Sequence, residues 1–192
     1  KGDYVLMLFQ CLLGLGLFGM LAVVEHTVFI KLPDFMYILF YIFLFCSVFL
    51  GEILNFYYRF EFWDTILHGF SGAMLGALGF IIVESLNRSK RGYVRLSPLF
   101  VALFSFCFAI AAGALWEIVE FTFDGILKLN MQKYALRDKT LLIGREALSD
   151  TMFDIIVDVS SALLVSAVWL IVKFIKRKNP RVKYRLYNGK LR

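Results

Sequence analysis

Acidic residues recur at helical spacing in three apolar stretches of the chain. Within each group the residues are three or four positions apart, and side chains at that spacing lie on one face of a helix. The groups are Asp64 with His68; Glu117, Glu120 and Asp124; and Asp150, Asp154 and Asp158. The sequence therefore predicts three polar stripes on three otherwise apolar helices.

These residue types point to metal chemistry. Carboxylate oxygens and an imidazole nitrogen are ligands that hard and borderline divalent cations prefer. Several carboxylates in a medium of low dielectric constant must either hold protons or be neutralised by cations. We therefore expect a divalent metal ion, and Mg²⁺, Mn²⁺, Ca²⁺, Fe²⁺ and Zn²⁺ all stay open. The expected ligands are His68, Glu117, Glu120, Asp150 and Asp154.

Other polar residues near these stretches take different roles in this hypothesis. Asp158 and Asp64 are the expected catalytic residues, acting either as general base or as supports for the ligands. The expected substrate-binding residues are Arg145, Asp124 and Trp116. Two structural alternatives stay open, because Asp64 also suits a helix N-cap and Arg145 a solvated loop position.

The elements that carry these stripes are long and apolar. Apolar residues make up 60% of the 192 residues and charged residues only 19%, whereas an ordinary soluble domain is roughly 45–50% apolar. This composition excludes a soluble globular domain, a disordered chain and a disulfide-stapled module. A helix needs about 20 apolar residues to cross a bilayer. The sequence predicts an all-α, polytopic transmembrane helix bundle of about five spans, at residues 4–24, 35–53, 64–83, 97–123 and 150–172.

Basic residues predict the orientation of this bundle. Lys and Arg gather in residues 84–96 and after residue 172, and such clusters mark the cytoplasmic side. We expect one transmembrane domain over residues 1–178 and a basic cytoplasmic tail over 179–192. The formal net charge of +6 is then an orientation signal, and no nucleic-acid partner is expected. All three stripes would lie in the outer half of the membrane. Residues 125–148 suit either a re-entrant helix or a helix lying on the surface.

The motifs resemble those of a known family. The most specific segments are Trp116-Glu117-Ile-Val-Glu120 and Asp150-Thr-Met-Phe-Asp154 followed by Asp158. Over roughly residues 35–170 the chain resembles the YjdF-like family of small bacterial inner-membrane proteins and, more distantly, the VanZ-like family. This resemblance implies a multi-pass protein of the bacterial plasma membrane with about five helices, and it implies no reaction.

Three functions follow from the stripes. The favoured one is a metal-dependent hydrolase or transferase that acts on a lipid or cell-envelope substrate, with membrane lipids and a lipid-linked substrate as partners. An alternative is a carrier for a cation or a proton-coupled solute that uses the same carboxylates. Against it, the inner halves of the predicted spans are almost entirely apolar. A second alternative is a non-catalytic membrane partner or lipid-binding subunit.

Overall fold

The computed structural model describes residues 31–88 and 96–178, together with residues 8, 12, 14–16, 19–20, 22–23 and 25–27. These residues form helices and loops with one isolated β-bridge, between Ala135 and Leu141, so the all-α prediction is confirmed. The elements from residue 34 onward are α2 (Asp34–Leu44), the π-helix η1 (Phe45–Ile53), α3 (Phe56–Arg59), α4 (Trp63–Arg88), α5 (Pro98–Leu127) and α6 (Arg145–Lys178).

Among the described residues, four helical segments are long and apolar enough to cross a membrane. They are Asp34–Ile53, Trp63–Leu86, Pro98–Leu127 and Arg145–Arg177, and they match the last four predicted spans. The predicted first span, 4–24, falls largely outside the described residues. The centre of the basic 84–96 segment and the tail 179–192 also lie outside them.

Local sequence signals set the ends of α5. Ser97 caps its start, since the Ser97 Oγ accepts a hydrogen bond of 3.2 Å from the Phe100 N–H, and Pro98 occupies the first turn. The helix ends at Lys128, whose left-handed backbone (φ 56°) turns the chain away. The stripe of Glu117, Glu120 and Asp124 therefore occupies the last three turns of this helix.

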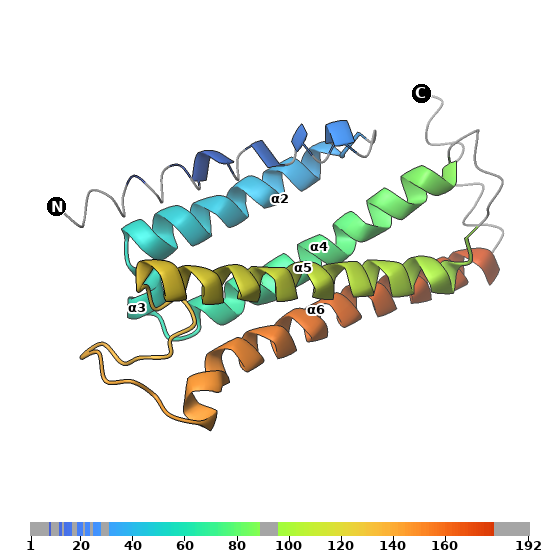
Figure 1. The fold of residues 1–192 in the computed structure, drawn as a ribbon. Coiled ribbons are helices and arrows are strands. Elements are labelled where there is room, and N and C mark those ends of the chain that lie inside the picture. The colour runs from blue at the N-terminus through green and yellow to red at the C-terminus, as the bar shows by residue number, and fades with distance from the viewer. Residues whose placement is uncertain are drawn as a thin grey trace.

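Helices α4, α5 and α6 form a bundle in which each helix packs against the other two, while α2 packs against α4 (Figure 1). Glycines allow close approach. A Cβ on Gly79 would lie only 2.9 Å from the Cα of Ser105, so α4 and α5 touch backbone to backbone there. The outward faces expose large apolar side chains such as Leu115, Phe121 and Leu164, as expected of a bundle surrounded by lipid.

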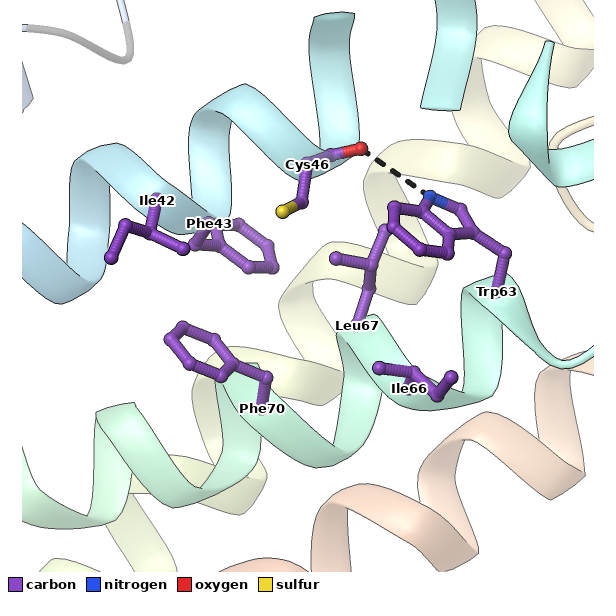
Figure 2. A pocket seen from close by; sticks show the side chains of 7 residues that line it. All are labelled: Ile42, Phe43, Cys46, Trp63, Ile66, Leu67 and Phe70. Atoms are coloured by element: carbon purple, nitrogen blue, oxygen red, sulfur yellow. Dashed lines mark hydrogen bonds between the residues drawn. The ribbon is translucent and has the colours of Figure 1, made fainter. Parts of the chain in front are cut away.

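A small apolar cavity of about 70 Å³ lies between η1, the end of α2 and the first turns of α4 (Figure 2). The Trp63 indole N–H closes one side of it by donating to the Cys46 carbonyl at 3.3 Å. Leu67 and Phe70 line it from α4, and none of the residues that line the cavity is charged. The cavity therefore contributes no polar group to the stripes.

Residues 128–144 connect α5 to α6 as a loop without a helix, so this part of the segment forms neither a re-entrant helix nor a helix on the surface. The loop lies at the end of the bundle where α4 and α6 begin and α5 ends (Figure 1). It is tied down by Asp124, whose two carboxylate oxygens accept hydrogen bonds from the backbone N–H groups of Met131 (2.8 Å) and Gln132 (3.0 Å). The loop thus covers the helix ends that carry the acidic stripes.

Candidate metal centre

The three predicted stripes meet at this end of the bundle. Six of their eight side chains are buried and expose between 3 and 7% of their surface; they are His68, Glu117, Glu120, Asp124, Asp154 and Asp158. Asp64 and Asp150 are partly exposed at the rim. Asp64 stands in the first turn of α4, where the helix dipole favours a carboxylate. Helical spacing has therefore brought these groups to one place, as the sequence predicted.

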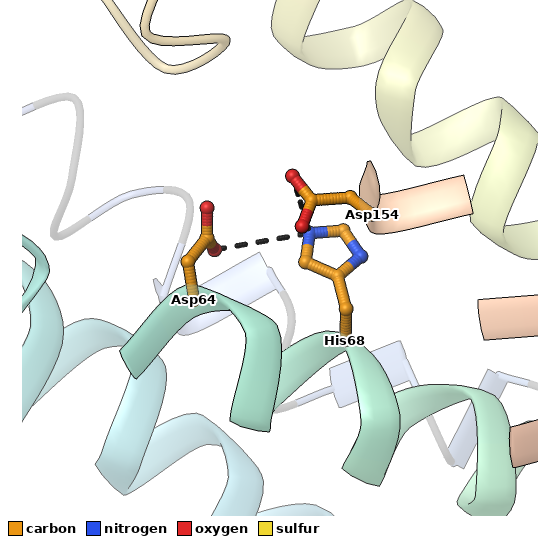
Figure 3. A group of neighbouring side chains, drawn as sticks. All are labelled: Asp64, His68 and Asp154. Atoms are coloured by element: carbon orange, nitrogen blue, oxygen red, sulfur yellow. Dashed lines mark ion pairs between the residues drawn. The ribbon is translucent and has the colours of Figure 1, made fainter. Parts of the chain in front are cut away.

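Three carboxylates converge on one nitrogen of His68. The Nε2 atom lies 3.8 Å from Asp64 Oδ1, 3.9 Å from Glu117 Oε1 and 3.8 Å from Asp154 Oδ2. Figure 3 shows the carboxylates of Asp64 and Asp154 facing the same nitrogen of the imidazole ring. These distances exceed those of hydrogen bonds. Moreover, Glu117 Oε1 and Asp154 Oδ2 are buried and have no hydrogen-bond partner. Nε2 therefore has three carboxylate oxygens at similar distances and is hydrogen-bonded to none of them.

The second nitrogen of His68 is held by Asp158. Nδ1 lies 3.3 Å from Asp158 Oδ2, and the Ser71 hydroxyl contacts the other oxygen of that carboxylate at 3.4 Å. A histidine whose Nδ1–H donates to a carboxylate presents the lone pair of Nε2 to the opposite side. Here that side holds the three converging oxygens. This carboxylate–histidine pairing is the usual way in which proteins orient a histidine that binds a metal.

The distances from Nε2 to the three carboxylate oxygens suit ligands of one divalent cation. A tetrahedral ion with bonds of about 2.0–2.2 Å holds its ligand atoms roughly 3.3–3.6 Å apart. The observed 3.8–3.9 Å distances from Nε2 are only a few tenths of an ångström longer. The ligand atoms of Asp64, His68 and Asp154 also lie within 4.8 Å of one another. One nitrogen and three carboxylate oxygens form a donor set that suits Mn²⁺, Fe²⁺ and Zn²⁺.

Lys133, in the covering loop, closes the mouth of the centre. Its ammonium donates to Asp64 Oδ2 at 2.6 Å and to Asp150 Oδ1 at 2.7 Å. Burial alone would lower the pKa of Lys133, but the Asp64 and Asp150 carboxylates outweigh it and raise that pKa. Lys133 therefore stays charged at neutral pH and links the loop to α4 and α6.

Gln132 orients one of the converging carboxylates. Its side-chain amide lies 3.4 Å from Glu117 Oε2 and donates to the Thr151 hydroxyl at 2.9 Å. Because Oε2 is engaged in this way, Oε1 is the oxygen of Glu117 that faces His68. Gln132 of the loop thus connects Glu117 of α5 with Thr151 of α6.

A glycine makes room for the Asp158 carboxylate. A Cβ added to Gly113 on α5 would lie 3.1 Å from Asp158 Cγ and closer still to Oδ2, the oxygen that faces His68. On α4, a Cβ on Gly72 would lie 2.9 Å from the Asp158 carbonyl oxygen. Both positions therefore require glycine if α6 is to bring Asp158 against His68.

Only some of the expected metal ligands face His68 Nε2 in the structure. His68, Glu117 and Asp154 contribute converging atoms, and Asp64, expected as a catalytic residue, contributes the fourth. Asp150, expected as a ligand, contacts Lys133 instead.

Three further predicted residues have other contacts. Glu120 Oε1 accepts a hydrogen bond of 2.8 Å from the Trp116 indole N–H, so these two residues bind each other beside the centre. Arg145 is exposed at the first position of α6, where its carbonyl accepts from the Ser149 hydroxyl. The cation that the structure places against the stripes is Lys133.

Sequence reasoning missed Ser71, Gln132 and Lys133. Ser71 lies three residues after His68 on the same stripe, and that spacing was enough to find it. Gln132 and Lys133 lie in a loop, where no periodicity relates a residue to its partners in space.

Comparisons with known proteins agree with a membrane protein. The chain is 36% identical over 117 residues to a Thermotoga maritima protein described as uncharacterized, and the matched segment covers 58% of this chain and 52% of that protein. The chain thus spans about half the length of this relative. No solved structure is a significant match. Residues 2–174 match the family described as "Predicted membrane protein (DUF2238)". With its four candidate spans, the chain is an integral, multi-pass membrane protein that belongs to the DUF2238 family.

Proposed function

We propose that the protein is a metal-dependent membrane enzyme, a hydrolase or group transferase that acts on a lipid or lipid-linked substrate of the bacterial cell envelope. The observation that carries this proposal is the convergence of Asp64 Oδ1, Glu117 Oε1 and Asp154 Oδ2 on His68 Nε2. Two of these oxygens are buried without a partner, which is costly unless a cation pairs with them.

A divalent cation bound there would supply a Lewis acid and a route to a nucleophile at neutral pH. The surrounding residues prepare the centre for it. Asp158 holds the proton of His68 at Nδ1 and fixes the ring, and Gln132 fixes Glu117. Glu120, buried and hydrogen-bonded to Trp116, is the remaining carboxylate of the α5 stripe and the candidate general base.

The setting favours a lipid substrate with an uncharged scissile bond. The centre lies a few turns inside the bundle, and the outer faces of its helices are apolar. The carboxylates of the stripes that stay ionised repel an anionic phosphate, which favours an ester, amide or glycosidic bond as the scissile bond. The basic residues of 84–96 and of the tail mark the cytoplasmic side, so the metal centre, at the opposite end of the bundle, would face outward in the plasma membrane.

A carrier receives less support. Beyond the centre, toward the opposite end of the bundle, the described interior is closed by the apolar side chains of Phe80, Val83, Val101 and Ala102. Trp169 of α6 stacks on Phe80 with ring centroids 4.4 Å apart. A permeating cation would meet few polar groups there.

Metal content tests the site. Protein purified in detergent and dialysed against Mn²⁺ should retain one ion per chain. Asp154→Asn and Glu117→Gln should each abolish this binding. The matched control is Glu146→Gln, because Glu146 is an exposed acid in the first turn of the same helix as Asp154. Wild-type protein without stoichiometric metal would refute the metal centre.

An assay of lipid turnover tests the proposed hydrolase or transferase activity. Metal-loaded protein in liposomes of bacterial total lipid extract should release a product that mass spectrometry detects and that disappears in Asp154→Asn. If the protein binds its metal and no lipid species changes, the metal centre stands and the hydrolase or transferase assignment fails.

A further inference from the structure

Lys133 lies where a second cation would bind beside the metal centre. Its ammonium contacts Asp64 and Asp150 at 2.6 and 2.7 Å, and these carboxylates come from two different helices. The second oxygen of Asp150 is buried and has no hydrogen-bond partner. The amino group therefore takes the place of a small cation between the two carboxylates.

Asp64 links this position to the metal centre. Its Oδ1 faces His68 Nε2 at 3.8 Å, while its Oδ2 binds the Lys133 ammonium. A carboxylate that offers one oxygen to each of two cations is the bridging arrangement of dinuclear sites, whose ions lie about 3.5–4 Å apart. Asp64 would therefore bridge the proposed metal ion and the Lys133 ammonium, as a carboxylate bridges the two ions of a dinuclear centre.

The Lys133 ammonium and a second divalent ion cannot occupy the Asp64–Asp150 position together, because both are positively charged. A divalent ion at the Asp64–Asp150 position and the Lys133 ammonium would repel each other at short range. Removal of the lysine charge leaves two carboxylates, Asp64 and Asp150, unpaired near the other acids. Such a position then attracts a cation from solution.

We propose that Lys133 limits the centre to one divalent cation by occupying a second cation position formed by Asp64 and Asp150. The inference rests on the proposed metal centre and adds to it a residue that sets how many ions bind. A lysine that only fastened the loop would affect stability and leave the number of ions unchanged.

The test is the Mn²⁺ stoichiometry of purified full-length protein, measured by equilibrium dialysis and elemental analysis. Wild type and Lys133→Arg should bind one ion, and Lys133→Met should bind two. Lys133→Met combined with Asp150→Asn should return to one ion, because the second position then lacks a ligand charge. Electron paramagnetic resonance gives an independent measure, since the spectrum of isolated Mn²⁺ in the wild type should change to that of a spin-coupled pair in Lys133→Met.

Each outcome separates the two claims. A wild type that binds no ion refutes the metal centre itself. If the wild type and Lys133→Met each bind one ion, the metal centre stands and the proposed role of Lys133 is refuted. The same holds if the wild type already binds two ions. If Lys133→Met does not fold, Lys133→Gln replaces it, with the same expected second ion.

Discussion

Gly113 provides a sensitive test of how the bundle positions His68. An alanine at this position places its Cβ 3.1 Å from Asp158 Cγ and closer to Oδ2. Asp158 is 3% exposed and held by Ser71 and His68, so the carboxylate cannot move away without losing its hydrogen bonds. Gly113→Ala is therefore expected to displace Asp158 and release the His68 ring.

The magnitude follows from three contributions to the free energy of unfolding. Overpacking costs about 1–3 kcal/mol, and the lost bond to a charged group costs about 1.5–3 kcal/mol. Alanine regains about 0.8–1.0 kcal/mol of helix propensity. We expect a net loss of about 1.5–5 kcal/mol. Mutation of a group that orients a metal ligand also weakens metal binding by about 10–100-fold.

The assay is unfolding in detergent with and without Mn²⁺. At a concentration 100 times the wild-type Kd, bound Mn²⁺ stabilises the wild type by about 2.7 kcal/mol. With binding weakened 10–100-fold, the same concentration stabilises Gly113→Ala by only ~0.4–1.4 kcal/mol. The control is Gly76→Ala, whose Cβ would lie 3.7 Å from Val165 Cγ1, an ordinary contact. Gly113→Ala protein with wild-type stability and wild-type Mn²⁺ affinity would refute the reasoning.

Three further predictions concern the same end of the bundle. Gly72→Ala should lower the unfolding temperature, because its Cβ would lie 2.9 Å from the Asp158 carbonyl oxygen and closer to Ser161 Oγ; an unchanged melting curve would contradict this packing. Asp124→Ala should free the N–H groups of the covering loop, so that hydrogen exchange in residues 128–144 rises while α6 stays protected; unchanged exchange would argue against this anchor. Because the pKa of Lys133 is raised in the folded protein, its contribution to stability should be complete below the ordinary lysine pKa of about 10.4 and be lost only as pH rises further. The stability difference between wild type and Lys133→Met should therefore stay constant from about pH 7 to pH 9, and a steady decline within that range would contradict the prediction.

The polar stripes could be predicted from sequence because spacing alone fixes the face of a helix. Residues such as Asp154 and Asp158 had to share a face, and burial of charged groups in a membrane bundle requires that such faces meet. The start of α6 was harder to place. The predicted span began at residue 150, whereas the helix extends back through Arg145-Glu-Ala-Leu148, which are good helix formers. Hydropathy detects the membrane-embedded part of a helix and misses its polar first turns.

Sequence could not show which atoms of the stripes converge. Asp150 and Asp154 are one turn apart on α6, yet Asp154 faces His68 and Asp150 faces Lys133. That difference depends on the axial position of α6 against α4 and α5, where Gly72 and Gly113 respectively allow close contact with Asp158. The roles of Gln132 and Lys133 depend on the path of an irregular loop, for which the sequence carries no periodic signal.

X-ray absorption spectroscopy of the protein loaded with Mn²⁺ shows which side chains bind the metal. If His68 and the carboxylates form a metal centre, the first shell should consist of nitrogen and oxygen atoms with the multiple-scattering signature of one imidazole, and His68→Gln should remove that signature. A spectrum of hydrated Mn²⁺ without imidazole, identical in wild type and His68→Gln, would show that the carboxylates and His68 do not form a metal centre.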